Sequence, residues 1–323
     1  MTDISMKHLR YFDALARHGH FGRAAHSCAI SQPALSVQIK ELEEILGAPL
    51  VERGARQIRL TSLGDAFALR VRDILRGVDE LGDLARASHS PLVGRLRIGV
   101  IPTVAPYLLP RFVKALGARY PGIDLRPREA VTQTLIEDLL QGRLDTAIVA
   151  LPVSEPALNE VAIFQEEFVL VRPQEDADDP VPNADALREM RLLLLEEGHC
   201  FRDQALSFCK LSSSSPRDLM EASSLSTLVQ MVGAGIGVTL IPEMAVPIET
   251  RSASVSIARL PPPRPSRTIG MVWRKTTPLT EQLGHIADIV RQAGILEGST
   301  GKAAPPLCPP RWAVSVRSHA NLR

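Results

Sequence analysis

The stretch Ser31-Gln32-Pro33-Ala34-Leu35-Ser36 decides how the N-terminal part of the chain folds. Serine is a preferred N-cap and proline is tolerated in the first helical turn, so this stretch predicts the start of a helix. Gly47 ends the helix. Apolar residues at helical spacing form one buried stripe, made of Leu35, Ile39, Leu42 and Leu46. The residues left on the exposed face near the helix start are Gln32, Pro33, Ser36, Val37 and Lys40.

Two further helices are predicted before this one. The first presents Leu9, Phe12, Leu15 and Ala16 on one face, and the second, shorter helix contains Phe21, Ala24, Ala25 and Cys28. Two short helices joined by a sharp turn, with small polar residues exposed on the second, form the helix-turn-helix arrangement of DNA-binding proteins. We expect Cys28 to be a core residue.

Three arginines follow the third helix: Arg53, Arg56 and Arg59, spaced around Gly54. They are interpreted as a hairpin wing that contacts phosphates, although a solvated strand edge would also accept them. Their place directly after a recognition-type helix favours DNA. The expected DNA-binding residues are therefore Gln32, Pro33, Ser36, Lys40, Arg53 and Arg56.

A long helix is predicted next, capped by Thr61 or Ser62 and running to about residue 88. Its apolar residues alternate in steps of four and three, as in a heptad seam: Phe67, Val71, Ile74, Val78, Leu81 and Ala85. This face could pack on its own domain. Dimerisation is favoured, because a symmetric DNA site needs two copies of the binding unit.

Composition limits the possible classes of protein. The chain has 323 residues, which suggests two domains, and a net charge of only +1, so that any nucleic-acid surface must be local. No apolar run reaches the length of a membrane span and no signal peptide opens the chain. Four cysteines do not make a disulfide framework at this length, so we expect a cytoplasmic, reducing setting.

From residue 95 to about 297 the pattern alternates strands and helices. This rhythm predicts a parallel sheet with helices on both faces. The glycines at 233, 235 and 237 precede a strand instead of following one, so they are not a nucleotide fingerprint. The tail at 298–323, rich in proline and small or basic residues and containing Cys308, is expected to be disordered.

The chemically distinctive stretch is Gly198-His199-Cys200-Phe201-Arg202-Asp203-Gln204, which Phe208-Cys209 follows. Cys200 lies beside His199 and two residues before Arg202, and neighbouring cations favour the reactive thiolate. The acidic residues Glu196, Glu197 and Asp203 have the opposite effect on this thiol. If this segment is helical, the two cysteines lie about 13 Å apart along the axis. A disulfide needs Cα atoms within roughly 7 Å, so it cannot form without unwinding. On cysteine count alone, two small buried hydrophobes are favoured. The spacing matches no common zinc site.

The N-terminal part resembles the LysR-type transcriptional regulators. The matching pieces are Phe21-Gly22-Arg23-Ala24-Ala25, Ser31-Gln32-Pro33-Ala34-Leu35-Ser36 and Leu60-Thr61-Ser62-Leu63-Gly64, where the family more usually has alanine in place of Leu63. The stretch 224–242 resembles the effector domain of the same family. The resemblance implies an α/β protein with a winged helix-turn-helix at 6–64, a linker helix at 62–89 and a two-lobed effector domain, similar to periplasmic binding proteins, at 95–297. A small effector would occupy the interlobe cleft.

Further stretches are Ile101-Pro102-Thr103-Val104, Pro106-Tyr107-Leu108-Leu109-Pro110, the segment 198–209 and Arg267-Thr268-Ile269-Gly270. With these, the chain resembles the peroxide-sensing members of this family over nearly all of 6–295. By matching position, Cys200 would be the peroxidatic cysteine and Cys209 the resolving one. Thr103 and Thr132 would help to hold peroxide. His199, Arg202, Asp203 and Arg267 would shape the effector pocket. From the residues alone, Thr103 would be a helix-capping residue and Arg267 a surface arginine.

The function expected from this resemblance is that of a DNA-binding regulator, not an enzyme, that senses hydrogen peroxide through a reversible Cys200–Cys209 disulfide. It implies promoter DNA, hydrogen peroxide and RNA polymerase as partners, a homodimer or a tetramer built as a dimer of dimers, and no cofactor, metal or membrane. One alternative is a LysR-type regulator that binds an organic metabolite and has inert cysteines. A thiol peroxidase is a second alternative, against which the DNA-binding half argues.

Overall fold

The computed structural model describes residues 3–52, 58–87, 93–208 and 221–294. The chain divides into two compact units, Met1–Ala85 and Arg86–Arg323. Within the described ranges, no helix has both the length and the apolar character needed to cross a membrane.

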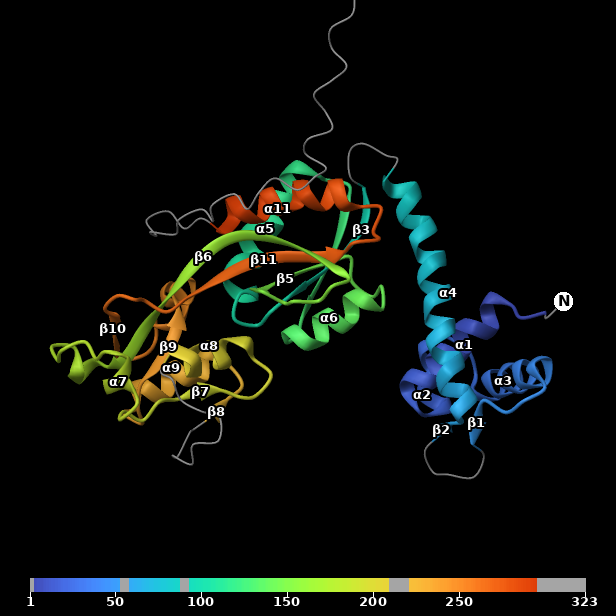
Figure 1. Ribbon diagram of the computed structural model, residues 1–323, viewed down its shortest axis with the longest axis horizontal. Helices are drawn as coiled ribbons and strands as arrows, with labels where there is room; N and C mark the ends of the chain where they lie inside the picture. The colour runs from blue at the N-terminus through green and yellow to red at the C-terminus, as the bar shows by residue number, and fades with distance from the viewer. Residues whose placement is uncertain (1–2, 53–57, 88–92, 209–220, 295–323) are drawn as a thin grey trace, which may run out of the picture. The chain divides into compact units, whose positions relative to one another are not determined.

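The N-terminal unit contains the helices and strands expected of a winged helix-turn-helix (Figure 1). They are α1 (Met6–His18), α2 (Phe21–Ser27), α3 (Gln32–Leu46), β1 (Val51–Glu52), β2 (Arg59–Leu60) and α4 (Ser62–Ala87). Ser31 caps α3, because its hydroxyl accepts a hydrogen bond from the Ala34 backbone N–H at 3.3 Å. Gly47 ends the helix in the left-handed conformation, with φ of 69°. The expected boundaries of this helix are confirmed.

The core of this unit is formed by apolar faces of all four helices. Its fully buried members include Leu15, Phe12, Leu35, Ile39 and Leu42. The α3 stripe predicted from sequence is therefore confirmed, with Leu46 partly buried at its end. The carboxylate of Glu43 accepts hydrogen bonds from the backbone N–H groups of Leu50 and Val51 at 2.8 and 3.1 Å. These bonds attach β1, the first strand of the hairpin, directly to α3.

The apolar seam of α4 is divided between two environments. Its first part belongs to the unit's own core, since Val71 is only 1% exposed and the Phe67 ring contacts Phe12 edge to face at 5.3 Å. Further along, Ile74 and Leu81 are 49% and 64% exposed. The first part of the seam therefore packs on its own domain, which is the alternative left open from the sequence, because a helix that leaves a small domain must first cover that domain's core.

The second unit is built on a seven-stranded sheet with the order β10-β6-β11-β5-β3-β4, to which β9 adds by pairing with β6. The strands of this sheet are β3 (Gly94–Val100), β4 (Ile123–Glu129), β5 (Thr146–Leu151), β6 (Leu158–Pro173), β9 (Thr239–Pro242), β10 (Val255–Arg259) and β11 (Ser266–Arg274). A separate two-stranded sheet pairs β7 (Leu194–Leu195) with β8 (Glu221–Ala222). The helices are α5 (Ala105–Arg119), α6 (Thr132–Leu140), α7 (Ala184–Leu187), α8 (Cys200–Phe208), α9 (Leu225–Gly233), α10 (Val246–Glu249) and α11 (Thr280–Gly294), with short 3-10 turns at Gln174–Asp176 and Glu243–Ala245.

The sheet is mixed, which corrects the expectation of a parallel sheet. β3 pairs in parallel with β4 and β5, as the alternating pattern predicts. β11, however, is antiparallel to both β5 and β6. The chain leaves one half of the unit along β6 and returns along β11, so these two neighbouring strands must run in opposite directions.

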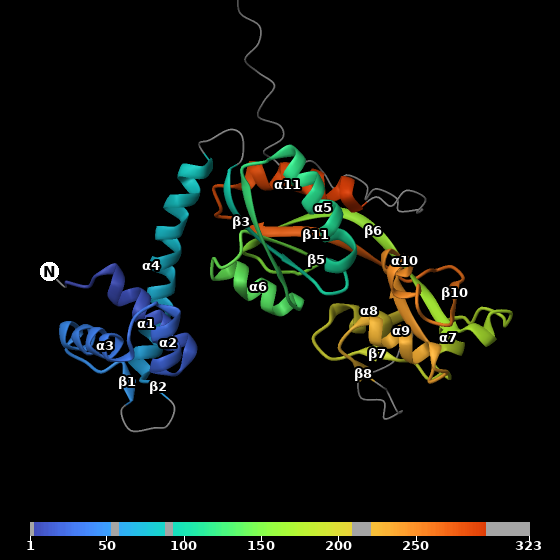
Figure 2. The same ribbon diagram turned by 180° about the vertical axis from the view of Figure 1, so that it is seen from behind.

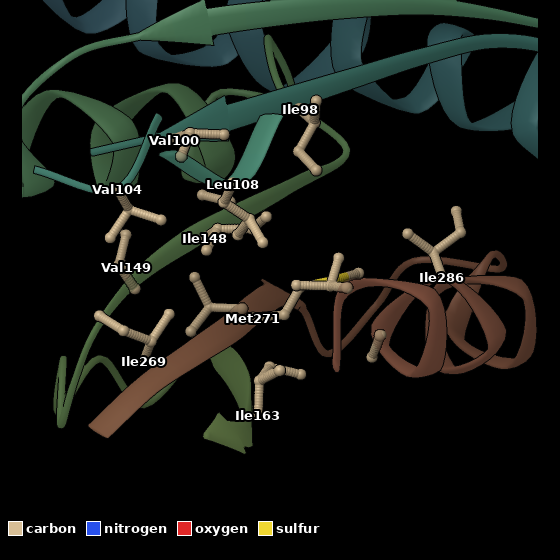
Figure 3. Packing of buried hydrophobic residues seen from close by; sticks show 14 of the residues in the cluster. Ile98, Val100, Val104, Leu108, Ile148, Val149, Ile163, Ile269, Met271 and Ile286 are labelled. Carbon is tan, nitrogen blue, oxygen red and sulfur yellow. The ribbon is translucent and has the colours of Figure 1, made fainter. Parts of the chain in front are cut away.

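Two separate apolar cores divide this unit into two lobes (Figures 1 and 2). The first lobe contains β3, β4, β5, α5, α6 and α11, and the second contains α7, β7, α8, α9, β9 and β10. β6 belongs to both, because Ile163 and Phe164 lie in the first core and the residues from Phe168 to Val171 lie in the second. Figure 3 shows the first core, where Ile148 and Met271 of the sheet lie with Leu108 of α5 and Ile286 of α11.

Candidate functional site: a recognition helix and a cysteine between two lobes

The exposed start of α3 presents the side chains expected to contact DNA. Gln32, Pro33, Ser36 and Lys40 are all exposed, and Lys40 forms an ion pair with Glu44 at 3.3 Å on the outer face. Arg53 and Arg56 lie outside the described residues, between the antiparallel strands β1 and β2. The four described residues share one face of the helix, so they could contact a single groove of DNA together.

His20 is a residue of this face that the sequence pattern did not indicate. It is the N-cap of α2, and its Nδ1 accepts a hydrogen bond from the Gly22 backbone N–H at 3.0 Å. A Cβ placed on Gly22 would lie 3.1 Å from the His20 ring and 3.4 Å from Gln32 Oε1. His20 and Gln32 therefore lie close together. Histidine is not a usual N-cap, so no common capping signal marks it.

In the second unit, the cysteine segment begins at a sharp turn after β7. Gly198 adopts φ of 95°, a conformation that favours glycine, and Cys200 is the first residue of α8. The next residues of α8 are buried in the second lobe's core, namely Phe201, Ala205 and Leu206. Cys200 itself is partly buried and packs against the core of the first lobe. A helix of one lobe thus carries a thiol that contacts the other lobe.

Arg267 joins the two lobes close to this cysteine. Its Nη1 and Nη2 donate hydrogen bonds to the side chain and backbone oxygens of Thr103, at 2.8 and 3.1 Å, in the turn between β3 and α5. The guanidinium also lies over the rings of Phe201 and Phe168, at 5.4 and 5.9 Å. Its Nε donates to Glu166 at 2.8 Å. Thr103 and Arg267 are therefore brought together and buried, so the capping residue and the surface arginine that the residues alone suggested are not what the structure contains.

Thr132 and His199 lie on the two sides of the same region. A Cβ placed on Gly198 would lie 4.0 Å from Val131 Cγ1, so the turn before Cys200 lies beside the start of α6. Thr132 is the first residue of α6, and its buried hydroxyl has no hydrogen-bond partner within the described residues. Burial lowers the pKa of His199, and the carboxylates of Glu196 and Glu129 oppose that effect. The region thus holds an unpartnered hydroxyl and an imidazole whose neutral form is favoured.

These residues are called the junction below: Thr103, Thr132, Glu166, His199, Cys200 and Arg267. Arg202 and Asp203 have other surroundings. Arg202 donates to the Leu195 carbonyl at 3.0 Å and to Glu221 at 2.6 Å, so its guanidinium binds within the second lobe. Asp203 is exposed, and Cys209 lies outside the described residues.

Sequence reasoning missed a second contact between the lobes. Tyr107 of α5 donates its hydroxyl hydrogen to Glu249 of α10 at 2.7 Å, and Ser226 of α9 donates to the other oxygen of Glu249 at 2.5 Å. Burial, and then the bond to Glu249, raise the pKa of Tyr107, so the phenol stays protonated. Tyr107 stands in a stretch that matches the peroxide-sensing relatives, Pro106-Tyr107-Leu108-Leu109-Pro110, but no spacing or periodicity links it to Ser226 or Glu249.

Comparison with known proteins agrees with this geometry. Residues 6–65 match the model of the bacterial regulatory helix-turn-helix proteins of the lysR family, and residues 89–294 match the LysR substrate binding domain. A probable hydrogen peroxide-inducible genes activator from Streptomyces viridosporus is 42% identical, over 90% of this chain and 94% of its own length. The DNA-binding transcriptional dual regulator OxyR of Escherichia coli K12 is 40% identical, over 89% of this chain and 95% of its own length.

Solved structures give the same relationship. Full-length OxyR from Pseudomonas aeruginosa, a cysteine-to-aspartate variant, superposes with a TM-score of 0.70 at 34% identity, over 89% of this chain and 95% of that one. A Corynebacterium glutamicum OxyR variant with hydrogen peroxide bound gives a TM-score of 0.62 at 32% identity, over 90% and 92%. The chain belongs to the LysR family of bacterial helix-turn-helix regulators, within which it groups with the OxyR-type proteins.

Proposed function

We propose that the chain is a DNA-binding transcription regulator that senses hydrogen peroxide through Cys200 and controls genes of the oxidative-stress response. The observation that supports this most directly is the position of Cys200, which belongs to a helix of the second lobe and packs against the first. A chemical change at this thiol acts where the two lobes meet. The relatives carry OxyR and peroxide-inducible activator names, which fits a regulator and not a peroxidase.

The chemistry proposed at Cys200 begins with attack of its thiolate on one oxygen of hydrogen peroxide. The O–O bond breaks, Cys200 becomes a sulfenic acid, and the departing hydroxide takes a proton to become water. The thiolate of Cys209 then attacks the Cys200 sulfur, the S–S bond forms and the S–O bond breaks, releasing a second water. Two thiols are oxidised by two electrons and one peroxide is reduced to two waters. A cellular dithiol would reverse the step by disulfide exchange.

The junction offers groups suited to a small polar ligand. The Thr132 hydroxyl is available to donate or accept a hydrogen bond. Thr103 accepts from Arg267 through its side-chain oxygen, which leaves its own hydroxyl hydrogen to donate elsewhere. His199 in its neutral form can accept a proton. In this proposal Thr103 and Thr132 orient peroxide, His199 assists proton transfer, and Arg202 holds the start of α8 in place.

Disulfide formation would require α8 to unfold at least in part. The helix runs from Cys200 to Phe208, and Cys209 is the next residue. At about 1.5 Å of rise per residue, nine steps separate the two cysteines by about 13 Å, beyond the roughly 7 Å that a disulfide permits. Unwinding removes Phe201 from the face of Arg267 and so alters the contact between the lobes. We propose that this change alters the assembly of a dimer or a dimer of dimers, and through it the contact with promoter DNA and RNA polymerase in the cytoplasm.

The test is peptide mapping of protein treated with one equivalent of peroxide, together with footprinting on its own promoter in both redox states. Cys200→Ser should abolish the response, because no sulfenic acid can form. Cys209→Ser should still be oxidised at Cys200 but should stop at the sulfenic acid or over-oxidise, as trapping with a sulfenic-acid reagent would show.

Cys28→Ser and Cys308→Ser are the controls and should keep the full response. A peroxide-induced disulfide between Cys200 and Cys308 would refute the proposed pairing. A footprint that changes with no disulfide formed would refute the disulfide as the switch.

A further inference from the structure

The ion pair between Glu166 and Arg267 lies where the chain crosses between the lobes. The two residues are directly opposite each other in the antiparallel pairing of β6 with β11. Their side chains are 4% and 0% exposed, and the two charged groups are 2.8 Å apart. The positive charge of Arg267 and the negative charge of Glu166 therefore compensate each other inside the protein.

The guanidinium of Arg267 has each of its three nitrogens engaged by the protein. Nε donates to Glu166, Nη1 to the Thr103 hydroxyl oxygen and Nη2 to the Thr103 carbonyl. The other oxygen of Glu166 accepts from the Met244 backbone N–H at 3.3 Å. Burial raises the pKa of Glu166, and Arg267 opposes that effect as its nearest cation. The charge of the arginine is therefore paired within the protein, without any external anion.

We infer that Glu166 is a specificity-determining residue: it occupies Arg267 as an internal carboxylate and thereby excludes organic anions from the junction. A second carboxylate brought to Arg267 would meet like charge from Glu166 and would lose its hydration without gaining a free cation. A small neutral ligand is not repelled by Glu166 and has no ionic hydration to lose. This inference rests on the proposed function, since it explains why the sensor would respond to a neutral oxidant and not to a metabolite acid.

The prediction that follows is a gain of binding. Glu166→Ala removes the methylene and carboxylate that lie beyond Cβ, and acetate contains the same atoms. Acetate should therefore enter the vacated space, pair with Arg267 and restore the lost charge compensation. In reduced Glu166→Ala protein, a tenfold excess of acetate over its Kd should raise the thermal unfolding midpoint of the effector unit by about 3–6 °C relative to chloride at the same ionic strength.

Three controls separate this effect from a general salt effect. The wild-type chain should show no difference between acetate and chloride. Glu167→Ala removes the adjacent carboxylate, which is 34% exposed and pairs with Arg259 and Arg264, and it should not gain acetate binding. The double variant Glu166→Ala with Arg267→Ala should also lose the response to acetate.

If Glu166→Ala does not fold in chloride, its refolding yield from urea becomes the measurement, and a yield restored by acetate supports the inference. Equal midpoints or yields in acetate and chloride would overturn it, as would an acetate response that survives in the double variant. Acetate binding is measured without peroxide, so it can fail while Cys200 still oxidises. It can also succeed in a chain whose cysteines prove inert.

Discussion

Helices α3 and α8 both begin at a face of the candidate site, but the protein holds them in different ways. α3 is anchored by a stripe along its length, with Leu35, Ile39 and Leu42 buried in one core, and it exposes its starting residues to an outside partner. α8 is shorter and turns its first residue toward the opposite lobe. Phe201, Ala205 and Leu206 bury it in the second lobe's core, and its other ties include the Arg202 bonds and the edge-to-face contact of Phe201 with Phe168, whose ring centroids are 4.7 Å apart.

The difference indicates what each helix is suited to do. A helix that must present side chains at fixed spacing to DNA benefits from continuous apolar anchoring. A helix that would unwind when one thiol is oxidised, as proposed for α8, benefits from contacts that can be lost together, since elements that move come from the less stable parts of a structure. The two-residue strands β7 and β8, to which Arg202 ties α8, fit the second description.

The largest effect is expected from Val71→Asp in α4. Val71 is 1% exposed in the core that also anchors α3, so a buried unpaired carboxylate should destabilise the N-terminal unit by about 4 kcal/mol and abolish DNA binding. Ile74→Asp with Leu81→Asp should leave that unit folded but should lower the mass of the assembly, because both residues are exposed in a single chain. Thermal unfolding and light scattering measure the two outcomes. An unchanged mass would remove α4 as the dimer contact.

Arg202→Ala tests how strongly the polar ties of Arg202 hold α8. Its loss should cost about 1.5–3 kcal/mol, the usual range for hydrogen bonds to a charged group. We expect faster hydrogen exchange in α8 and faster alkylation of Cys200, with no change in α3. Arg126→Ala, an arginine on β4 whose side chain is 63% exposed, is the matched control. If α8 exchanges no faster in Arg202→Ala than in the control, the comparison between the two helices fails.

Gln32→Ala tests the exposed face of α3. If Gln32 makes a bidentate contact to a base, the variant should lose about 1–3 kcal/mol of discrimination between the operator and unrelated DNA. Lys40→Ala is the contrasting variant, which should weaken binding to all sequences alike and reduce the salt dependence by about one counterion. Titrations at two salt concentrations distinguish them. If Gln32→Ala weakened binding to the operator and to unrelated DNA equally, Gln32 would contact the DNA backbone and not a base.

The two helices also differ in how far sequence could predict them. The α3 face follows from periodicity and capping within one short stretch, and the structure contains that helix and its buried stripe. The junction brings together residues 103, 132, 166, 199 and 267, which only the strand register and the crossing of β6 and β11 place near one another. Periodicity carries no information on such contacts. Resemblance supplied Thr103, Thr132, His199 and Arg267. It contained Tyr107 in a matching stretch but gave it no role, and nothing in the sequence pointed to Glu166.

Tyr107→Phe should sharpen the comparison by weakening the contact between the lobes away from the cysteine. The variant removes one hydrogen bond to Glu249, which keeps its bond from Ser226, so we expect a loss of about 1 kcal/mol in the unfolding free energy of the effector unit. Tyr120→Phe, at the end of α5, is the control. If the proposed coupling between the lobes is correct, Tyr107→Phe should also shift the fraction of DNA bound at a given degree of oxidation. An unchanged fraction would restrict the coupling to the junction.

The smallest effect concerns pH and His199, the residue just before α8. Burial lowers the pKa of His199 in the folded chain. Between that lowered value and the ordinary value of about 6.5, the unfolded chain binds more protons than the folded one, so stability falls as pH falls through this window. His199→Asn cannot take up the proton and should lose less stability between pH 7 and pH 5.5 than the wild type, as urea unfolding at both pH values would show. The difference should be confined to the effector unit, because α3 lies in the other unit. A variant with the same pH dependence as the wild type would show that His199 is not a buried neutral base, and would remove it from the proton transfer proposed at Cys200.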